Sequence, residues 1–377
     1  MLENTTRTEL SQLGEFGLIQ KIRDTVEIKN NSTETGIGDD AAVINFQDKR
    51  CLVSTDMLIE GVHFDLTYVP LKHLGYKSAV VNFSDIFAMN GTPTQMLVSV
   101  ALSNRFSLEA VEELYAGIQL ACRKYHVDLV GGDTTSSPAG LSISITVLGE
   151  AEKNKIVYRS GAQEKNLICV SGDLGAAYMG LQILEREKQV YLGNPNLQPD
   201  LEGNDYILER QLKPEARKDI VELLSVLNVQ PTSMIDVSDG LASDLIHLCQ
   251  ESGTGCFLYE EKIPIDTQTM ERALQFNIDP TVCALSGGED YELLFTVPIE
   301  MHDKIVNNPD ITIIGHMTDK NSGLNLITRD GKQHNQGQIE QCRAHRQPES
   351  GQNASARPIG ARRSVYDIHG CCGHVSV

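Results

Sequence analysis

This chain of 377 residues contains no tryptophan, and aromatic residues make up only 5% of it. Basic residues are also scarce, with 32 Lys and Arg against 51 Asp and Glu, which gives a formal net charge of −19. Nucleic-acid binding through the phosphate backbone needs clustered basic side chains, so this charge argues against that class of protein. Apolar runs of about 18 residues, which a membrane helix requires, are missing too. We therefore expect a cytoplasmic globular protein that binds neither nucleic acid nor a membrane.

Several common catalytic motifs are absent from the sequence. It has no GxxxxGK[ST] loop, no GxSxG turn and no HExxH pair, which argues against Walker-type nucleotide sites, α/β-hydrolases and the corresponding zinc enzymes. Of the nine cysteines, the first six are isolated in apolar runs and indicate buried thiols. The remaining candidates for a metal cluster are His369, Cys371, Cys372 and His374, but their spacing fits no structural zinc site.

One short segment resembles a dinucleotide-binding loop, the sequence GIGDDA at 36–41. No strand pattern precedes it, and Asp39 and Asp40 stand where a pyrophosphate would approach. Two carboxylates there would repel an anionic ligand unless a cation lay between them. The segment is therefore more consistent with metal binding than with direct binding of a dinucleotide.

Hydrophobic periodicity predicts strands and helices that alternate, which is typical of an α/β or α+β protein. We expect helices over 10–28, 71–90 and 107–125, strands over 51–56, 96–102 and 141–151, and strand-turn-helix units over 166–184 and 233–253. Residues 188–214 read as loop-rich, and 310–317 reads as the last short strand. The expected domains are 1–152 and 153–331, followed by an atypical and poorly ordered tail over 332–377.

Acidic residues recur at the ends of these apolar segments or beside glycine. They are Asp39, Asp40, Asp56, Asp133, Asp236 and Asp239. Asp85 joins them because Ser78, Asn82 and Asp85 share one stripe of a predicted helix. A single Asp after a strand is more often a helix cap or a turn former, and Asp239, Asp244 and Asp133 fit such roles. The number of these acids, and their pairing with Gly, Ser and Thr, favours a site for several metal ions.

Six motifs resemble, in order, those of the thiamine-monophosphate kinase family. They are GDDAAV (38–43), STDMLIEGVHF (54–64), SDIFAMNGTP (84–93), VGGDTT (130–135), IDVSDGLASDL (235–245) and SGGEDYELLFTV (286–297). The resemblance covers about residues 14 to 331. It implies a two-domain architecture like that of aminoimidazole ribonucleotide synthetase, with an N-terminal sheet domain that forms a homodimer and a C-terminal α/β domain.

The resemblance also implies roles for individual residues. It assigns Mg²⁺ ligation to Asp39, Ser54, Thr55, Asp56, Asp85, Asp133, Asp236 and Asp239. It assigns contacts with ATP, the co-substrate, to Tyr115, Gly132, Asp133, Arg159 and Ser238. It assigns contacts with thiamine monophosphate to His63 and Glu289. No residue is assigned as a general base, because the attacking phosphate oxygen is already ionised.

The expected reaction is transfer of the γ-phosphoryl group of ATP to thiamine monophosphate, which forms thiamine diphosphate. Two alternatives stay open: another ATP-using enzyme of the same superfamily with a different acceptor, and a catalytically silent dimer that binds nucleotide and metal. The tail departs from the family pattern. The family usually ends in a short segment with an aromatic residue that helps to cover the substrate, whereas here Tyr366 is the only aromatic residue after 332.

Overall fold

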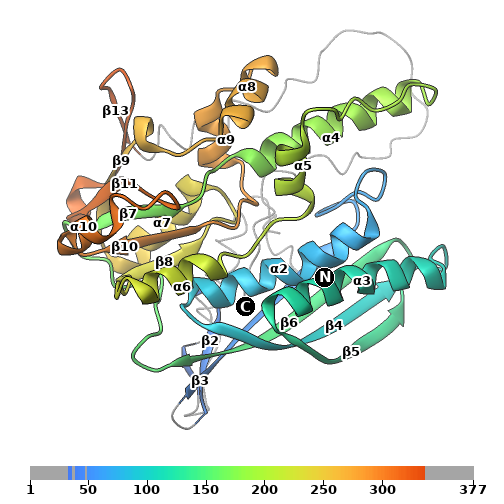
Figure 1. The fold of residues 1–377 in the computed structure, drawn as a ribbon, viewed down its shortest axis with the longest axis horizontal. Helices are drawn as coiled ribbons and strands as arrows, with labels where there is room; N and C mark the ends of the chain where they lie inside the picture. The colour runs from blue at the N-terminus through green and yellow to red at the C-terminus, as the bar shows by residue number, and fades with distance from the viewer. Residues whose placement is uncertain (1–32, 36–38, 47–48, 336–377) are drawn as a thin grey trace, which may run out of the picture.

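The computed structural model describes residues 33–35, 39–46 and 49–335, and these form two units, each built on its own sheet (Figure 1). The expected helix over 10–28 lies outside the described residues. The first sheet ends with β6 (Leu141–Glu152) and the second begins with β7 (Leu167–Ser171). Within the described residues, no helix combines the length and apolar character needed to cross a bilayer.

The first sheet has six strands in the order β1-β2-β3-β6-β4-β5. Besides β6, its strands are β1 (Thr33–Thr35), β2 (Ala42–Phe46), β3 (Lys49–Ile59), β4 (Thr92–Leu102) and β5 (Asp128–Ser136). All its neighbouring strands run antiparallel except β4 and β5, which are parallel. The expected strands over 51–56, 96–102 and 141–151 are therefore present, whereas β5, which contains the VGGDTT motif, was not predicted.

Two helices, α2 (Leu71–Ala88) and α3 (Leu108–Tyr125), cover one face of this sheet (Figure 1). Two glycines let their backbones approach closely. A Cβ on Gly75 would lie 2.0 Å from the carbonyl oxygen of Leu114, and a Cβ on Gly117 would lie 1.9 Å from that of Lys72. From Leu74 to Ala88 every residue of α2 is buried. The expected polar stripe of this helix is therefore not exposed to solvent but lies inside the molecule.

The second sheet has seven strands in the order β13-β12-β9-β11-β7-β10-β8, and only β12 and β9 run parallel. Besides β7, its strands are β8 (Ser233–Asp236), β9 (Gly255–Tyr259), β10 (Leu293–Val297), β11 (Ile311–Thr318), β12 (Leu324–Ile327) and β13 (Gln333–Asn335). The prediction that 310–317 is the last strand is wrong, because β12 and β13 follow it. The expected tail thus begins with a short strand, and residues 336–377 lie outside the described part.

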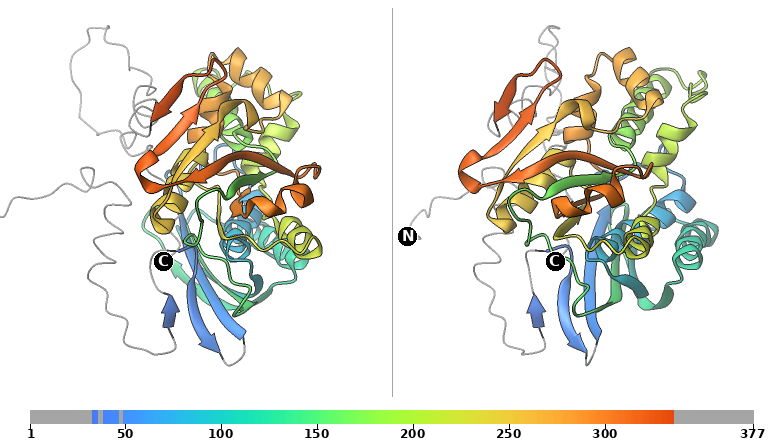
Figure 2. Two further views of the ribbon diagram at one scale, coloured as in Figure 1. Left: turned by 90° about the vertical axis from the view of Figure 1, so that its left-hand side faces the viewer. Right: turned by 60° about the vertical axis from the view of Figure 1, so that its left-hand side comes forward.

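The helices of the second unit pack on both faces of its sheet (Figure 2). They are α4 (Ala176–Gly193), α5 (Asp205–Leu212), α6 (Lys218–Val226), α7 (Leu241–Ser252), α8 (Thr267–Gln275), α9 (Pro280–Ser286) and α10 (His302–Ile305). Side chains of α7 and α9 share one core with the sheet, and those of α6 and α10 share another. The loop-rich interpretation of 188–214 was wrong in part, because α5 lies within that range.

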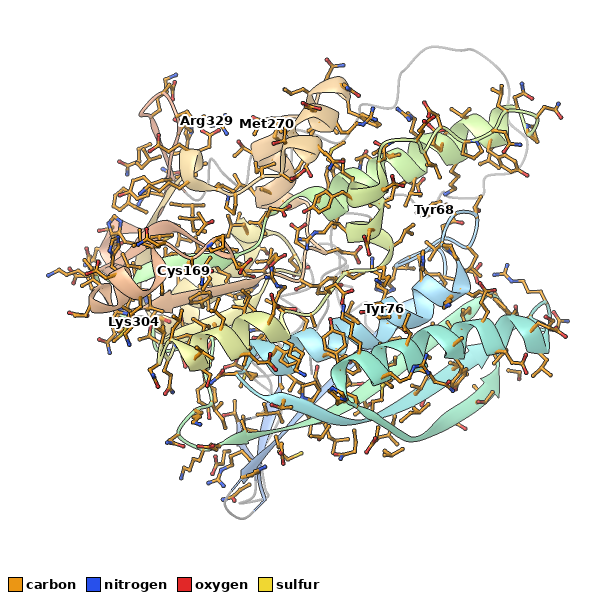
Figure 3. All side chains as sticks on the ribbon, viewed as in Figure 1. Tyr68, Tyr76, Cys169, Met270, Lys304 and Arg329 are labelled. Carbon is orange, nitrogen blue, oxygen red and sulfur yellow. The ribbon has the colours of Figure 1, made fainter. Side chains whose placement is uncertain are left out.

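Polar contacts join the two units along α2. Glu215, in the loop between α5 and α6, accepts hydrogen bonds of 2.6 Å from the hydroxyls of both Tyr76 and Tyr125. On the loop before α2, Tyr68 lies against α4 and donates to Glu185 at 2.8 Å. Figure 3 shows Tyr68 and Tyr76 on the side of the first unit that faces the second. Helix α2 therefore lies between the first sheet and the second unit.

Candidate functional site

Three buried carboxylates meet where the two units join. Asp40 precedes β2, Asp85 lies in the last turn of α2, and Asp236 ends β8. One oxygen of each lies within 4.8 Å of the others. A carboxylate in the last turn of a helix is disfavoured by the helix dipole, so the position of Asp85 is costly for folding alone. An acid at such a position is more consistent with a binding role than with a purely structural one.

Serine hydroxyls orient two of these carboxylates. Ser54 of β3 donates to Asp85 Oδ2 at 2.5 Å, and Ser84 of α2 donates to Asp236 Oδ2 at 2.6 Å. Side chains alternate along β3, so Ser54 and Asp56 both point toward α2 and are buried. The period-2 pattern of the strand thus places Asp56 on the same side as the cluster.

Arg159 binds the two aspartates of the GDD motif. Its Nη2 lies 2.5 Å from Asp40 Oδ1, and its backbone N–H donates to both carboxylate oxygens of Asp39 at 3.2 Å. Arg159 belongs to the segment that connects β6 to β7. This segment, which follows the first sheet in the sequence, therefore places the Arg159 side chain beside two acids that precede β2.

Burial and mutual repulsion hold protons on several of these acids. Burial, followed by the charge of Asp236, raises the pKa of Asp56 to about 8. Burial, followed by the charge of Asp40, raises the pKa of Asp39 and of Asp236 to about 7 each. The negative charge of these carboxylates is larger than the cationic side chains beside them can neutralise.

The cluster suits a divalent cation such as Mg²⁺. Its donors are carboxylate and hydroxyl oxygens, which are the ligands that hard cations prefer. A cation would also replace the protons that burial and repulsion now favour, because it stabilises the charged form of each acid. The donor set and its charge thus fit the metal that the sequence led us to expect.

The turn between β8 and α7 adds further acids. Asp239 and Ser238 are half-buried there, and the backbone N–H of Asp239 donates to Asp244 Oδ2 at 3.2 Å. Asp244 is thus the residue that stabilises the start of α7, and no side chain caps the helix at Gly240. Burial, followed by the charges of Asp239 and Asp236, raises the pKa of Asp244.

A second group contains the two residues expected to contact the acceptor substrate. His63 follows β3, and its Nδ1 accepts a hydrogen bond of 2.9 Å from the backbone N–H of Ile59. Burial lowers the pKa of His63, while the nearby charge of Glu289 opposes this effect. Glu289 in turn receives a hydrogen bond of 2.7 Å from Lys77 of α2. His63 and Glu289, 226 positions apart by their numbers, therefore lie in the same region.

Other predicted site residues lie on different surfaces. The Thr55 hydroxyl bonds to Thr146 at 2.9 Å on the face of the first sheet away from α2. Asp133 is exposed on β5, in register with Ser99 of β4. Gly132, beside it, lies against the backbone of β4, and Tyr115 is half-buried on α3. Within the described chain, the close carboxylate group does not include Asp133.

Some residues of the site were not among the sequence-based assignments. Asp40 was left out of the metal ligands, although it belongs to the carboxylate triad and the GDD motif contained the signal. Lys77 and Gln211 carry no local signal, since each contacts Glu289 only through the fold. Ser84 opens the SDIFAMNGTP motif, but its contact with Asp236 also arises only through the fold.

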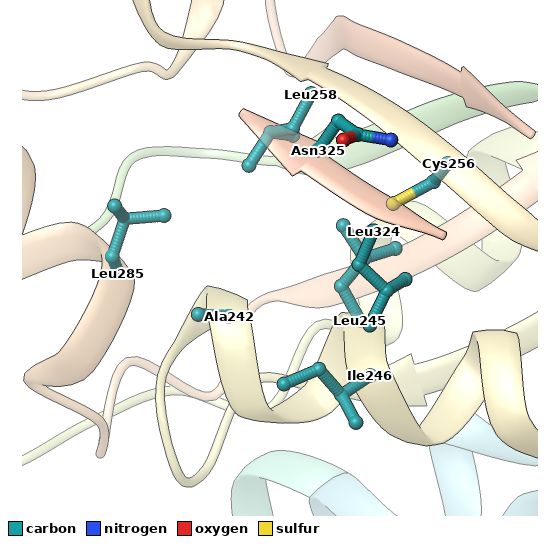
Figure 4. A pocket seen from close by; sticks show the side chains of 8 residues that line it. All are labelled: Ala242, Leu245, Ile246, Cys256, Leu258, Leu285, Leu324 and Asn325. Carbon is teal, nitrogen blue, oxygen red and sulfur yellow. The ribbon is translucent and has the colours of Figure 1, made fainter. Parts of the chain in front are cut away.

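A separate small apolar pocket lies between α7 and the strands β9 and β12 (Figure 4). It is lined by Ala242, Leu245, Ile246, Cys256, Leu258, Leu285, Leu324 and Asn325. Its lining holds none of the acids described above and only one polar side chain. A phosphorylated ligand therefore finds no charged partner in this pocket.

A family model described as "AIR synthase related protein, N-terminal domain" matches residues 38–151. Two structures of the hydrogenase maturation protein HypE share the fold, with TM-scores of 0.60 and 0.59 at 16% and 14% identity. The chain thus has the fold of the AIR synthase class.

Closer relatives identify the family within this class. The chain is 36% identical to thiamine-monophosphate kinase of Aquifex aeolicus over 82% of this chain and 92% of that protein. For the Bacillus subtilis enzyme the identity is 33%, over 84% and 95% of the two chains. The structure of AaThiL complexed with AMPPCP and TMP matches with a TM-score of 0.73 at 34% identity, covering 87% and 97%. The chain belongs to the thiamine-monophosphate kinase family.

Proposed function

We propose that this chain catalyses phosphorylation of thiamine monophosphate by ATP, with thiamine diphosphate and ADP as products. The observation that carries the proposal is the arrangement of two groups along α2: the carboxylate cluster around Asp85, and the His63 and Glu289 pair joined to the same helix through Lys77. The carboxylate cluster suits phosphates bound through a cation, and the His63 and Glu289 pair suits an organic acceptor. Family membership supports the same reading.

The proposed metal ligands are the residues derived from the motifs, with Asp40 added. They are Asp39, Asp40, Ser54, Asp56, Asp85, Asp236 and Asp239, together with Asp133 from outside the carboxylate cluster and Thr55. Thr55 would bind through its backbone carbonyl oxygen, because its hydroxyl bonds to Thr146 on the opposite face of the sheet. When bound, Mg²⁺ would neutralise the charge of the two phosphorylated substrates and so reduce their repulsion. The hydroxyls of Ser54 and Ser84 would keep the carboxylates of Asp85 and Asp236 oriented, which reduces the reorganisation needed on binding.

The remaining roles belong to side chains that bind the two substrates. Arg159 would contact ATP together with Tyr115, Gly132, Asp133 and Ser238. Burial lowers the pKa of His63, which favours its neutral form. Because its Nδ1 accepts a hydrogen bond, its proton lies on Nε2, and this N–H would donate to the acceptor substrate. A phosphate oxygen of thiamine monophosphate attacks directly, so no residue needs to remove a proton.

The dimer is part of the proposal. The face of the first sheet opposite α2 exposes apolar side chains that no described helix covers. These are Met57, Ile59, Leu97 and Val130. A second copy of the chain on this face would bury them, and it would also cover the face that carries Thr55. We propose the cytoplasm as the compartment, since ATP is the co-substrate.

Formation of thiamine diphosphate by the purified chain tests this function. The assay contains ATP, Mg²⁺ and thiamine monophosphate, and chromatography separates the products. We expect one thiamine diphosphate for each ADP formed. Turnover of ATP with a different acceptor but not with thiamine monophosphate would overturn the proposal. So would binding of ATP without any turnover.

A further inference from the structure

Lys77 is a buried lysine at the junction of the two units. It lies on α2 and is only 5% exposed. Its Nζ donates to Glu289 Oε2 at 2.7 Å and to the backbone carbonyl oxygen of Gln211 at 2.9 Å. Taking an ammonium group out of water costs free energy that only close acceptors offset, so these contacts fix the Lys77 side chain. The carboxylate that Lys77 contacts is the one expected to bind the acceptor substrate.

Hydrogen bonds fix Glu289 at its backbone N–H and at one carboxylate oxygen. Its φ is 59°, a left-handed conformation that Glu rarely adopts, and its N–H donates to the carbonyl oxygen of Ser238 at 2.8 Å. Gln211 Nε2 donates to the same Oε2 as Lys77, at 3.0 Å. Two donors on one oxygen fix the plane of the carboxylate, and therefore the direction of its second oxygen.

The two acids that flank Tyr291 in this loop are held by the second unit. Asp290 accepts from the backbone N–H of Gly175 at 2.8 Å. Glu292 is paired with Arg210 at 2.8 Å and with Arg217. All these partners belong to the second unit. The ion pair of Glu289 with Lys77 links this segment to the first unit, and Tyr291 packs into the core of that unit.

We propose that Lys77 is a positioning residue for the acceptor substrate. Together with Gln211 it holds the Glu289 carboxylate in the orientation that receives thiamine monophosphate, opposite His63. The acceptor offers a thiazolium cation and an aminopyrimidine donor, and both suit a carboxylate of fixed direction. Acceptor binding thereby depends on the contact of Lys77 with Glu289, whereas none of the residues proposed to contact ATP is held by Lys77. This inference rests on the proposed function.

A purely structural role for Lys77 makes a different prediction, and Glu215 provides the matched control. Glu215 also joins the units, through Tyr76 and Tyr125, but within the described part of the chain its hydrogen bonds and ion pairs involve neither Glu289 nor Gln211. If Lys77 only held the units together, Lys77→Met and Glu215→Gln would impair the enzyme in the same way. If Lys77 positions Glu289, only Lys77→Met would act selectively on the acceptor.

The test compares steady-state kinetics of the full chain for both substrates. We expect Lys77→Met to raise KM for thiamine monophosphate about 10- to 100-fold, the loss of one charge-assisted contact, and to change KM for ATP less than about twofold. Lys77→Arg should recover part of the loss. Glu215→Gln should leave both KM values within about twofold while lowering the melting temperature. If Lys77→Met does not fold, Gln211→Met carries the same expectation.

Three results would overturn the inference. One is an unchanged KM for thiamine monophosphate in Lys77→Met. Another is an equal rise in KM for both substrates, and the third is the same selective rise in Glu215→Gln. A wild-type protein that forms no thiamine diphosphate would overturn the proposed function, and the inference with it. Normal wild-type turnover with an unaffected Lys77→Met variant would overturn the inference alone.

Discussion

Ser84 of α2 donates its hydroxyl to Asp236 of β8 across 2.6 Å, although the two residues are 152 positions apart. This bond joins a helix of the first unit to the last residue of a strand of the second. Asp85, next to Ser84, lies within 4.8 Å of the same aspartate. The carboxylate cluster therefore exists only when the two units are in contact, and each unit alone holds part of it.

Asp56→Asn tests the carboxylate cluster directly. The substitution removes a charge that a bound cation would need but keeps the shape of the side chain. We expect thiamine diphosphate formation to fall at least about 100-fold. The fold should stay intact without metal, because burial and Asp236 already raise the pKa of Asp56 to about 8. Activity assays and thermal unfolding check both parts, and wild-type turnover in the variant would refute the role of Asp56.

Stability without a divalent cation should depend on pH in a defined direction. The pKa values of Asp39, Asp56 and Asp236 lie at about 7 to 8 in the folded chain, above the ordinary value of 3.8. The folded state therefore binds protons more tightly than the unfolded state. The stability from these protons is complete below about pH 4 and is lost as the pH rises through 7 to 8.

Thermal unfolding in a chelator should thus show a melting temperature that falls between pH 5 and pH 8. Added Mg²⁺ should raise the melting temperature more at pH 8 than at pH 6, because it competes with protons for the same oxygens. The melting temperatures measured at both pH values in buffer without Ca²⁺ or Mg²⁺ provide the control. An equal effect of Mg²⁺ at the two pH values would contradict the account of the cluster.

Gly117→Ala tests the close packing of α2 and α3. The new Cβ would lie 1.9 Å from the Lys72 carbonyl oxygen, so the helices must separate. We expect the free energy of unfolding to fall by about 3 kcal/mol. Gly193→Ala is the matched control: its Cβ would meet nothing within 4 Å, and it should be neutral or stabilise α4 by up to about 1 kcal/mol. Similar unfolding curves for both variants would show that the helices are not tightly packed.

Met57→Lys tests the open face of the first sheet. Met57 is 55% exposed there, and a lysine would bring an unpaired charge into a dimer interface. We expect light scattering to give the mass of a dimer for the wild type and of a monomer for Met57→Lys. Leu108→Lys is the control, since Leu108 is 69% exposed at the start of α3, away from this face. A wild-type monomer would rule out the proposed dimer.

The sequence predicted well those features that depend on local patterns. The 3.6-residue period of α3 and the alternation in β3, β4 and β6 arise from burial of one face, so these elements could be predicted. Helix α2 is buried on all sides from Leu74 onward, and its length and the Asn90-Gly91 stop signal predicted it. The order of six motifs pointed to the family that the comparisons identify. In the structure, Asp85 and Asp236, which the motifs assign to metal ligation, lie close together beside Asp40.

Other features depend on contacts between distant segments, for which the sequence has no local signal. Lys77 contacts Glu289 across 212 positions, and nothing in either neighbourhood indicates the pair. The strand β5 was missed because its two glycines weaken the strand pattern, although Gly132 is needed where a Cβ would lie 1.8 Å from the Val98 carbonyl oxygen. The helix α5 was missed because Gly203, Asn204 and Pro214 surround it with turn signals.

The most direct test of the central claim is the rate of thiamine diphosphate formation from ATP and thiamine monophosphate with and without Mg²⁺. The wild-type chain should form the product only when a divalent cation is present, with one ADP for each thiamine diphosphate. Asp56→Asn should be inactive at every Mg²⁺ concentration. Product formation by the wild type in excess chelator, or no product under any of these conditions, would contradict the account.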